Sequence, residues 1–280
     1  MRFAHVLVVG AGQMGGGIAQ VFAASGRQVS LHDAAPGAVE RGLATMGESL
    51  RRLAAKGAEI DPDEVLGRVS AVDGIVPADL MIEAVVEDRA VKETIFRDAD
   101  SVLPAEAILA SNTSSIPIAS LAAATSRPEK VIGMHFFNPV PVMALVEVVS
   151  TKETSAETRA AVVELAQELG KTPAEANDFP GFVSNRILLP FINEAVWALH
   201  DSVAEPDAID TIAKLGFNHP MGPLALADLI GLDTCVAILE VLRDGLDDER
   251  YEPCPLLREH VAAGRLGRKS GAGFYAYESP

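Results

Sequence analysis

The sequence predicts an α/β fold in which an N-terminal domain built on a mostly parallel sheet precedes an all-α C-terminal domain. Three observations favour this fold. Short runs rich in β-branched residues alternate with alanine-rich helical stretches over the first half of the chain, and beyond it the spacing of apolar residues is helical alone. At 280 residues the chain is also too long for one ordinary domain of about 100–200 residues, so two domains are expected.

The predicted strands of the first domain are short, and helical stretches separate most of them. The runs assigned as strands are Val6–Val9, Val29–Leu31, Val69–Val72, Leu80–Ile82, Ala107–Ala110 and Val131–Met134. Strands that are joined through helices pair in parallel and are connected by right-handed crossovers. The β-branched run Leu145–Val149 and a predicted helix over Ala156–Leu169 come next.

A proline and a glycine mark the predicted end of this domain within Asp178–Phe182. From Ser184 onward apolar residues recur at the spacing of a helix, and the segment Leu224–Leu242 has the same pattern. The first set of apolar positions comprises Ile187, Phe191, Ala195 and Leu199. We therefore assign residues 1–183 to the first domain and residues 184–280 to an all-α second domain.

The charge balance limits the possible partners. The chain has 39 acidic and 23 basic residues, which gives a net charge of −16. A field of this sign repels phosphate backbones and anionic membrane surfaces, so neither nucleic acid nor a membrane is expected as a partner. No apolar run reaches the roughly 20 residues that a membrane span needs, and glycines interrupt the apolar stretch where a secretory signal would be continuous. The sequence predicts a cytoplasmic protein.

The cysteines and histidines give no sign of a metal site. The two cysteines, Cys235 and Cys254, lie outside any CxxC pattern, which is typical of a reducing compartment and does not indicate thiolate ligands. The six histidines are scattered and form no HExxH motif. We expect no bound metal.

A glycine-rich turn, Gly10-x-Gly12-x-x-Gly15, follows the first predicted strand and opens a helical stretch at Gly16–Ala24. The second predicted strand ends at Asp33, about 20 residues on, and this order is typical of a Rossmann-type dinucleotide-binding domain. The glycines allow the backbone to approach a pyrophosphate at the helix N-terminus. Asp33 would bind the adenosine ribose and repel a 2′-phosphate, which favours NAD over NADP. An acidic residue in a surface loop is the alternative.

A histidine and a glutamate are candidates for proton transfer. His135 follows the predicted strand Val131–Met134, and Ser111–Ser115 follows Ala107–Ala110 in the same way, so both are expected in the crevice at the carboxyl edge of the sheet. Oxidation of a secondary alcohol requires loss of the hydroxyl proton as well as a hydride, and an imidazole can take that proton near neutral pH. Glu147 could orient the ring and stabilise its protonated form. Beside a dinucleotide site the pair favours an alcohol dehydrogenase, and a purely structural histidine is the alternative.

Two further groups of charged or polar residues are candidates for ligand binding. Glu87 and Lys92 follow the fourth predicted strand at its ligand-binding end, where they either contact the cofactor or form an exposed loop pair. Ser49, Arg52 and Lys56 fall on one face of a predicted helix. That face either binds phosphate groups or is a solvated helical surface.

Seven segments, spread over essentially the whole chain, resemble those of a known family. They are Gly10–Gly15, Ile82–Glu87, Ala110–Ser115, Gly133–Pro139, Pro180–Arg186, Asn218–Pro223 and Gly267–Tyr275. Together they closely resemble the short-chain L-3-hydroxyacyl-CoA dehydrogenase family, in particular its bacterial 3-hydroxybutyryl-CoA dehydrogenases. The resemblance implies an NAD-dependent enzyme that interconverts (S)-3-hydroxyacyl-CoA and 3-oxoacyl-CoA. It also implies that acyl-CoA binds in the cleft between the two domains and that the C-terminal domain forms a homodimer.

The resemblance assigns roles to individual residues. His135 becomes the general base or acid and Glu147 its orienting partner. Ser114 and Asn185 are implied to contact the substrate near its 3-oxygen. Ser49 and Lys56 match positions that contact CoA. The implied cofactor contacts are Gly10, Gly12, Gln13, Met14, Gly15, Asp33, Glu87, Lys92, Asn112, Ser114 and Asn138.

Two positions depart from the family pattern, and two other functions are weighed. Asp88 stands where relatives often have Asn or Ser, and Ser184 stands where Val is frequent. A sugar-acid or carnitine-type dehydrogenase on the same scaffold is the second hypothesis, because the hydride chemistry does not require CoA. A non-enzymatic NADH sensor is the third, but the sequence shows neither the DNA-binding element nor the basic patch that it would need.

Overall fold

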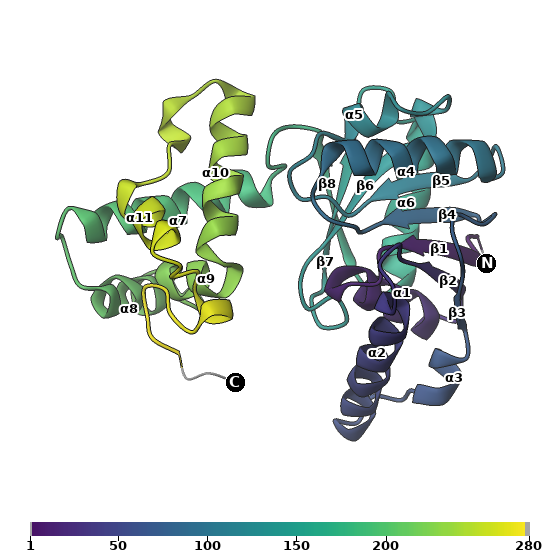
Figure 1. The fold of residues 1–280 in the computed structure, drawn as a ribbon, viewed down its shortest axis with the longest axis horizontal. Coiled ribbons are helices and arrows are strands. Elements are labelled where there is room, and N and C mark those ends of the chain that lie inside the picture. The colour runs from purple at the N-terminus through teal and green to yellow at the C-terminus, as the bar shows by residue number, and fades with distance from the viewer. Residues whose placement is uncertain (1, 278–280) are drawn as a thin grey trace. The chain divides into compact units, whose positions relative to one another are not determined.

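The computed structural model describes residues 2–277 (Figure 1). By its internal contacts the chain divides into two compact units, Met1–Phe179 and Pro180–Pro280. Each unit has its own hydrophobic core.

The first unit is built on one eight-stranded sheet. Its strands are β1 (His5–Val9), β2 (Gln28–His32), β3 (Val69–Ala71), β4 (Leu80–Glu83), β5 (Ile108–Ser111), β6 (Val131–Phe136), β7 (Leu145–Ser150) and β8 (Thr172–Asn177). They lie in the order β3-β2-β1-β4-β5-β6-β7-β8, and every neighbouring pair is parallel except β6 with β7. The mostly parallel sheet predicted from the sequence is confirmed. The strand order reverses between β1 and β4, which is where open sheets of this type bind ligands.

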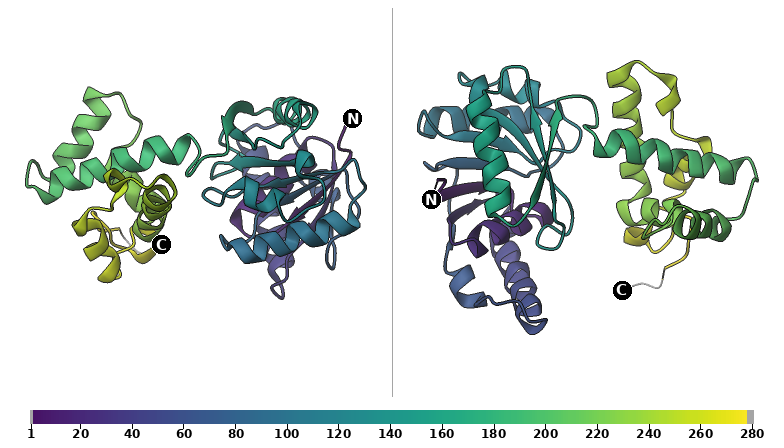
Figure 2. Two further views of the ribbon diagram at one scale, coloured as in Figure 1. Left: turned by 90° about the horizontal axis from the view of Figure 1, so that it is seen from above. Right: turned by 180° about the vertical axis from the view of Figure 1, so that it is seen from behind.

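Helices cover both faces of this sheet (Figure 1, Figure 2). They are α1 (Gln13–Ala24), α2 (Ala38–Ala55), α3 (Pro62–Leu66), α4 (Arg89–Val102), α5 (Ile118–Ala122), the 3₁₀ turn η1 (Pro128–Lys130) and α6 (Ala156–Glu168). Residues of α1, α2 and α6 share one core with alternate residues of the strands, such as Val6, Val8 and Ile132. Figure 1 shows α4 and α5 in front of the sheet, and the reverse view in Figure 2 brings α6 forward.

Strand β8 was not predicted, and its composition explains why. Thr172–Asn177 has the sequence TPAEAN and is mostly exposed, so it lacks the β-branched pattern of the other strands. It pairs only with β7 and forms one edge of the sheet. An edge position tolerates Pro173, because the missing N–H would face outward from the ladder.

The second unit is helical. It contains α7 (Ser184–His200), α8 (Pro206–Gly216), α9 (Pro223–Ile230), α10 (Leu232–Leu246), α11 (Pro255–Ala262) and the 3₁₀ turns η2 (Glu249–Tyr251) and η3 (Arg268–Ser270). Between residues 180 and 277 the only β-structure is a pair of isolated bridges. The segment Leu224–Leu242, predicted as helical, forms two helices that meet at Gly231.

Two buried aspartates fix the C-terminal segment of this unit. Asp228 accepts hydrogen bonds from the N–H groups of Phe274 and Tyr275, each at 3.0 Å. Asp210 accepts the Tyr275 hydroxyl at 2.9 Å. A Cβ at Gly273 would overlap the Asp228 carboxylate, which explains the glycine between these contacts.

No helix within residues 2–277 is both long and apolar enough to cross a membrane. In the same residues no three His, Cys, Asp or Glu side chains are grouped so that they could hold a metal ion.

Candidate active site

The glycine turn leads from β1 into α1, and Gly12 and Gln13 are exposed within it. Gly10 has a φ of 106°, a conformation that favours glycine, and its N–H donates to His32 O at 2.7 Å. A Cβ at Gly10 would lie 2.5 Å from Ala84 O, so a side chain here would push the turn away from the end of β4. The first turn of α1 has no acidic residue. The helix N-terminus therefore presents partial positive charge, which suits an anionic group such as a pyrophosphate.

Asp33 lies directly beside this turn. One carboxylate oxygen accepts the Ala11 N–H at 2.7 Å, and the other accepts the Ala35 N–H at 2.8 Å. These bonds join the glycine turn to the loop after β2. Asp33 also lines both cavities described next.

Two cavities lie around the switch point of the sheet. One, of about 860 Å³, is bounded by the glycine turn, the loop after β2 and helix α4, and is largely apolar, with Val85, Val91 and Ile95 in its wall. The other, of about 600 Å³, is bounded by α1, α2 and the loop after β6. Its wall includes Gly12, Gln13, Ser49, Arg52 and Asn138.

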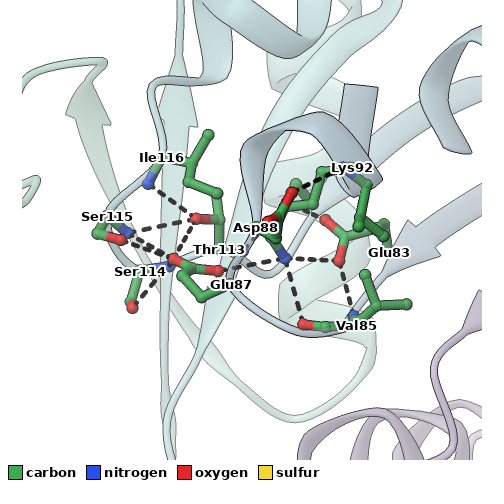
Figure 3. A network of polar contacts seen from close by, with 11 residues as sticks. Glu83, Val85, Glu87, Asp88, Lys92, Thr113, Ser114, Ser115 and Ile116 are labelled. Atoms are coloured by element: carbon green, nitrogen blue, oxygen red, sulfur yellow. Dashed lines mark hydrogen bonds and ion pairs between the residues drawn. The ribbon is translucent and has the colours of Figure 1, made fainter. Parts of the chain in front are cut away.

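Figure 3 shows a network of polar contacts at the ends of β4 and β5. Lys92, only 1% exposed, donates to Glu83 Oε1 at 2.6 Å and is paired with Glu87 Oε2 at 3.2 Å. Glu83 is fully buried, and its Oε2 accepts the Ser111 hydroxyl at 2.6 Å. Asp88 caps α4, the helix that carries Lys92, by accepting the Val91 N–H. Glu87 and Lys92 are thus paired, but the lysine is buried, so the two residues do not form an exposed loop pair.

Glu87 holds the loop after β5. Its Oε1 accepts the Thr113 hydroxyl at 2.6 Å and the N–H groups of Ser114 and Ser115 at 3.0 Å each. Partial burial acts to raise the pKa of Glu87, but the charge of Lys92 and the bonds from Thr113 and Ser115 outweigh it, and the pKa is lowered. The structure therefore brings Ser114, a predicted site residue, next to Glu87, another.

His135 and Glu147 lie opposite each other on β6 and β7. His135 Nδ1 is 2.8 Å from Glu147 Oε2, and the two residues are 8% and 3% exposed. Since a carboxylate can only accept a hydrogen bond, Nδ1 carries the hydrogen and the lone pair of the neutral ring is on Nε2. The Phe137 ring packs against the imidazole with centroids 4.7 Å apart. The predicted pair is thus in contact.

Asn112 precedes this pair in the chain, and Asn138 lies between its two residues. Asn112 follows β5, and its Oδ1 accepts the Phe136 N–H at 2.9 Å, which joins the loop after β5 to the end of β6. Asn138 follows β6, begins a cis peptide bond with Pro139, and lines the 600 Å³ cavity. The buried Lys171 holds the rest of that loop, because its Nζ donates to Val140 O and Met143 O at 2.7 Å each.

The remaining predicted residues lie on helices. Ser49 and Arg52 line the 600 Å³ cavity from α2, whereas Lys56 is the exposed C-cap of that helix and is not part of the cavity wall. Asn185 lies in the first turn of α7, in the second unit, and is 9% exposed.

The chain matches two family models that together cover nearly all of it. Residues 5–179 match the NAD binding domain of 3-hydroxyacyl-CoA dehydrogenase, and residues 181–277 match its C-terminal domain. It is 54% identical over 283 residues to a probable 3-hydroxybutyryl-CoA dehydrogenase from Bacillus subtilis, covering 99% of both chains. A crystal structure of (S)-3-hydroxybutyryl-CoA dehydrogenase from Ralstonia eutropha superimposes with a TM-score of 0.94 at 48% identity, covering 99% of both chains.

The chain belongs to the 3-hydroxyacyl-CoA dehydrogenase family. It is an NAD-dependent dehydrogenase with a Rossmann-type domain followed by a helical domain. A similar 3-hydroxybutyryl-CoA dehydrogenase from Bradyrhizobium diazoefficiens is 50% identical over 275 residues, covering 96% of this chain and 94% of that one.

The residues at the switch point fit NAD. The glycine turn and the N-terminus of α1 would hold the pyrophosphate, and Asp33 would accept the adenosine ribose hydroxyls. The apolar wall of the 860 Å³ cavity suits the flat face of an adenine.

Sequence reasoning did not single out three residues that hold the site together. Glu83, Ser111 and Lys171 are buried polar groups with hydrogen-bond partners on other elements. The one available signal was position, since Glu83 and Ser111 end two neighbouring strands. Lys171 gave no signal, because it precedes the strand that the sequence did not predict.

Proposed function

We propose that this dehydrogenase interconverts (S)-3-hydroxyacyl-CoA and 3-oxoacyl-CoA, with 3-hydroxybutyryl-CoA and acetoacetyl-CoA as the principal pair. The observation that carries the proposal is the buried contact between His135 and Glu147 at the carboxyl edge of the sheet that holds the dinucleotide site. The names of the similar proteins from B. subtilis and R. eutropha support a four-carbon acyl group.

In the proposed reaction His135 is the general base. It takes the proton of the substrate 3-hydroxyl at Nε2, the ring nitrogen that faces away from Glu147 in the hydrogen-bonded pair. NAD⁺, when bound, accepts the hydride and its two electrons from C3, which becomes a carbonyl carbon. Glu147 stabilises the imidazolium through its bond to Nδ1 and fixes the ring tautomer. In the reverse direction the protonated His135 returns the proton to the 3-oxygen.

We infer that two polar side chains bind the reacting end of the substrate. The Ser114 hydroxyl and the Asn185 amide would hydrogen-bond the acyl group near its 3-oxygen. Ser114 is suited to this, because Glu87 accepts its N–H and orders the loop that carries it. Asn112 and Asn138 would shape the nicotinamide side of the same site, one tied to β6 and the other in the cavity wall.

The CoA moiety is assigned to the exposed face of α2. Ser49 and Arg52 line the 600 Å³ cavity beside the glycine turn, and Arg41 lies in the same wall. Lys56, one turn beyond Arg52, would add a third cation for the CoA phosphates. In a chain with a net charge of −16, such a local group of basic residues can still attract an anionic substrate.

We also propose that the enzyme is a homodimer formed through its helical unit. Ile212 and Leu215 on α8 and Phe217 at its C-cap are 55%, 82% and 61% exposed, and Val203 nearby in sequence is 73% exposed. Large exposed apolar side chains that are close together mark association surfaces. Leu215→Glu should halve the molar mass measured by light scattering, and an unchanged mass would exclude this surface from the interface.

The free, buried thiols of Cys235 and Cys254 support a cytoplasmic location, where such thiols stay reduced.

The deciding experiment follows NADH oxidation at 340 nm with acetoacetyl-CoA, beside the same assay with NADPH and with free acetoacetate. We expect fast turnover of the thioester with NADH and a fall of about 10²–10⁴-fold in the His135→Gln variant, which is the usual contribution of a positioned acid or base. Normal turnover by that variant would refute the role of His135. Turnover of free acetoacetate in preference to the thioester would move the function to the free hydroxy acid class.

A further inference from the structure

Glu83 does not line either cavity described above, yet its buried carboxylate has three hydrogen-bond partners. It is the last residue of β4, is fully buried, and pairs in register with Ser111, the last residue of β5. Its side chain therefore lies at the base of both loops that leave the carboxyl edge of the sheet at this point (Figure 3).

The two carboxylate oxygens of Glu83 serve different loops. Oε1 accepts Lys92 Nζ at 2.6 Å and the Val85 N–H at 2.7 Å, which fixes the loop after β4 and the start of α4. Oε2 accepts the Ser111 hydroxyl at 2.6 Å, and that hydroxyl oxygen in turn accepts the Thr113 N–H at 3.1 Å. One buried group thus anchors the loop before α4 through one oxygen and the loop after β5 through the other.

Lys92 and Glu87 connect the same two loops a second time. Lys92 bridges Glu83 and Glu87, and the other oxygen of Glu87 accepts bonds from Thr113, Ser114 and Ser115. The three charges sum to −1 with Lys92 protonated and both carboxylates ionised. The buried pair of Glu83 and Lys92 is neutral, so the excess negative charge resides at Glu87, whose side chain is 38% exposed.

We propose that Glu83 is a positioning residue that couples the cofactor-side loop, residues 84–88, to the substrate-side loop, residues 112–115. It acts on the first loop through Lys92 and on the second through Ser111. The first half depends only on NAD being the cofactor. The second half rests on the proposed function, because it requires Ser114 to contact the acyl-CoA substrate.

The contact of Glu83 with Lys92 (the cofactor arm) and its contact with Ser111 (the hydroxyl arm) can be removed separately. Ser111→Ala removes the hydroxyl that Glu83 Oε2 binds and leaves the bond between Glu83 and Lys92 in place. Lys92→Met removes the cation from both Glu83 and Glu87 and leaves the bond between Glu83 and Ser111 in place. Glu83→Gln keeps the shape of the side chain and removes the charge on which both arms depend. Ser101→Ala, at an exposed serine that bonds Asp98 O within α4, is the matched control.

The experiment measures the dissociation constant of NADH by fluorescence titration and kcat/KM for acetoacetyl-CoA for each variant. We expect Ser111→Ala to lower kcat/KM about tenfold while NADH affinity changes less than about threefold, since one charge-assisted hydrogen bond is lost on the substrate side alone. Lys92→Met should weaken NADH binding about tenfold. Glu83→Gln should both weaken NADH binding and lower kcat/KM. Adding Ser111→Ala to Glu83→Gln should lower kcat/KM by less than about a further twofold, because the partner of Ser111 is already altered.

Two results would overturn the proposal. One is that each of the three variants loses NADH affinity and kcat/KM by the same factor, and that these losses follow the decrease in its thermal midpoint. A general loss of stability would give that result. The other is that Ser111→Ala and Glu83→Gln combine as independent factors. If Glu83→Gln does not fold, Ser111→Ala decides the question, because it should lower kcat/KM and leave NADH affinity nearly unchanged. If the wild type does not turn over acetoacetyl-CoA, the proposed function fails, while NADH titration of Lys92→Met still tests the cofactor arm.

Discussion

Replacing Glu147 with glutamine should lower kcat by about 10²-fold and leave the dissociation constant of NADH unchanged. The substitution keeps the size of the side chain and an oxygen that can accept the Nδ1–H of His135. It removes only the negative charge. Because Glu147 is 3% exposed and sits opposite His135 on the neighbouring strand, water cannot easily take its place.

The size of the effect follows from the contact distance. Nδ1 and Oε2 are 2.8 Å apart, so the centres of the two charges are roughly 4 Å apart when the ring is protonated. At the effective dielectric constant of about 20 that describes partly buried pairs, the attraction is about 4 kcal/mol. The neutral amide recovers part of it by hydrogen bonding, which leaves a loss of roughly 2–4 kcal/mol, or about 30- to 900-fold in rate at 1.36 kcal/mol per tenfold.

Steady-state oxidation of 3-hydroxybutyryl-CoA measures this loss, because the imidazolium forms in that direction. Glu175→Gln is the matched control, since Glu175 is an exposed carboxylate on the adjoining strand β8. Glu147→Gln should have little further effect in a His135→Gln background, since Glu147 acts through the ring. If the two substitutions multiply as independent factors, Glu147 does not work by stabilising His135. A Glu147→Gln variant with the wild-type kcat would refute the electrostatic role entirely.

Three further predictions follow from particular contacts. Because the pKa of Glu87 is lowered from 4.5, its interactions stabilise the fold fully above about pH 4.5 and lose that effect as the pH falls through the lowered value. In urea unfolding, the free energy of unfolding should therefore fall less between pH 6 and pH 4 for Glu87→Gln than for the wild type. Asp33→Asn should raise the ratio of NADPH to NADH turnover at least about tenfold, measured as kcat/KM, since it removes the charge that repels a 2′-phosphate; an unchanged ratio would contradict that role. Gly273→Ala should lower the free energy of unfolding by about 1–3 kcal/mol, because the added methyl group would overlap Asp228. Gly216→Ala is the control and should not lower it, since the nearest atom to a Cβ there is 3.8 Å away. Equal effects of the two variants in thermal melts would refute the packing argument.

The parts of the fold that could be predicted from the sequence are those encoded within a short stretch of chain. The turn at Gly10 and the acid at Asp33 are one strand, one turn and one helix apart, and each step has its own local signal. Strand β8 lacked such a signal, because an edge strand exposed on both faces needs no apolar alternation. Its place beside β7 is set by backbone pairing.

The candidate site likewise contains features that are encoded locally and contacts that depend on residues far apart in the sequence. His135 could be recognised as a candidate base from its position after a strand, but its contact with Glu147 depends on the antiparallel register of β6 and β7. The intervening residues contain two prolines and give no hairpin signature, so that register could not be read from spacing. The hydrogen bond between Glu83 and Ser111 could not be predicted for a related reason, since the two residues are 28 positions apart.

The acid–base pair and the loops of the site are held in place by different interactions. His135 and Glu147 are held by the hydrogen-bond ladder of two buried strands, so their distance is set by the backbone and is insensitive to charge elsewhere. The Ser114 loop has no ladder and depends on Glu87, which is itself tied to a buried lysine. A buried ion pair adds little net stability, but breaking it leaves a costly unpaired charge. Mutations in the charge network should therefore disturb ligand binding before they disturb proton transfer, whereas mutations in the strands should act in the opposite order.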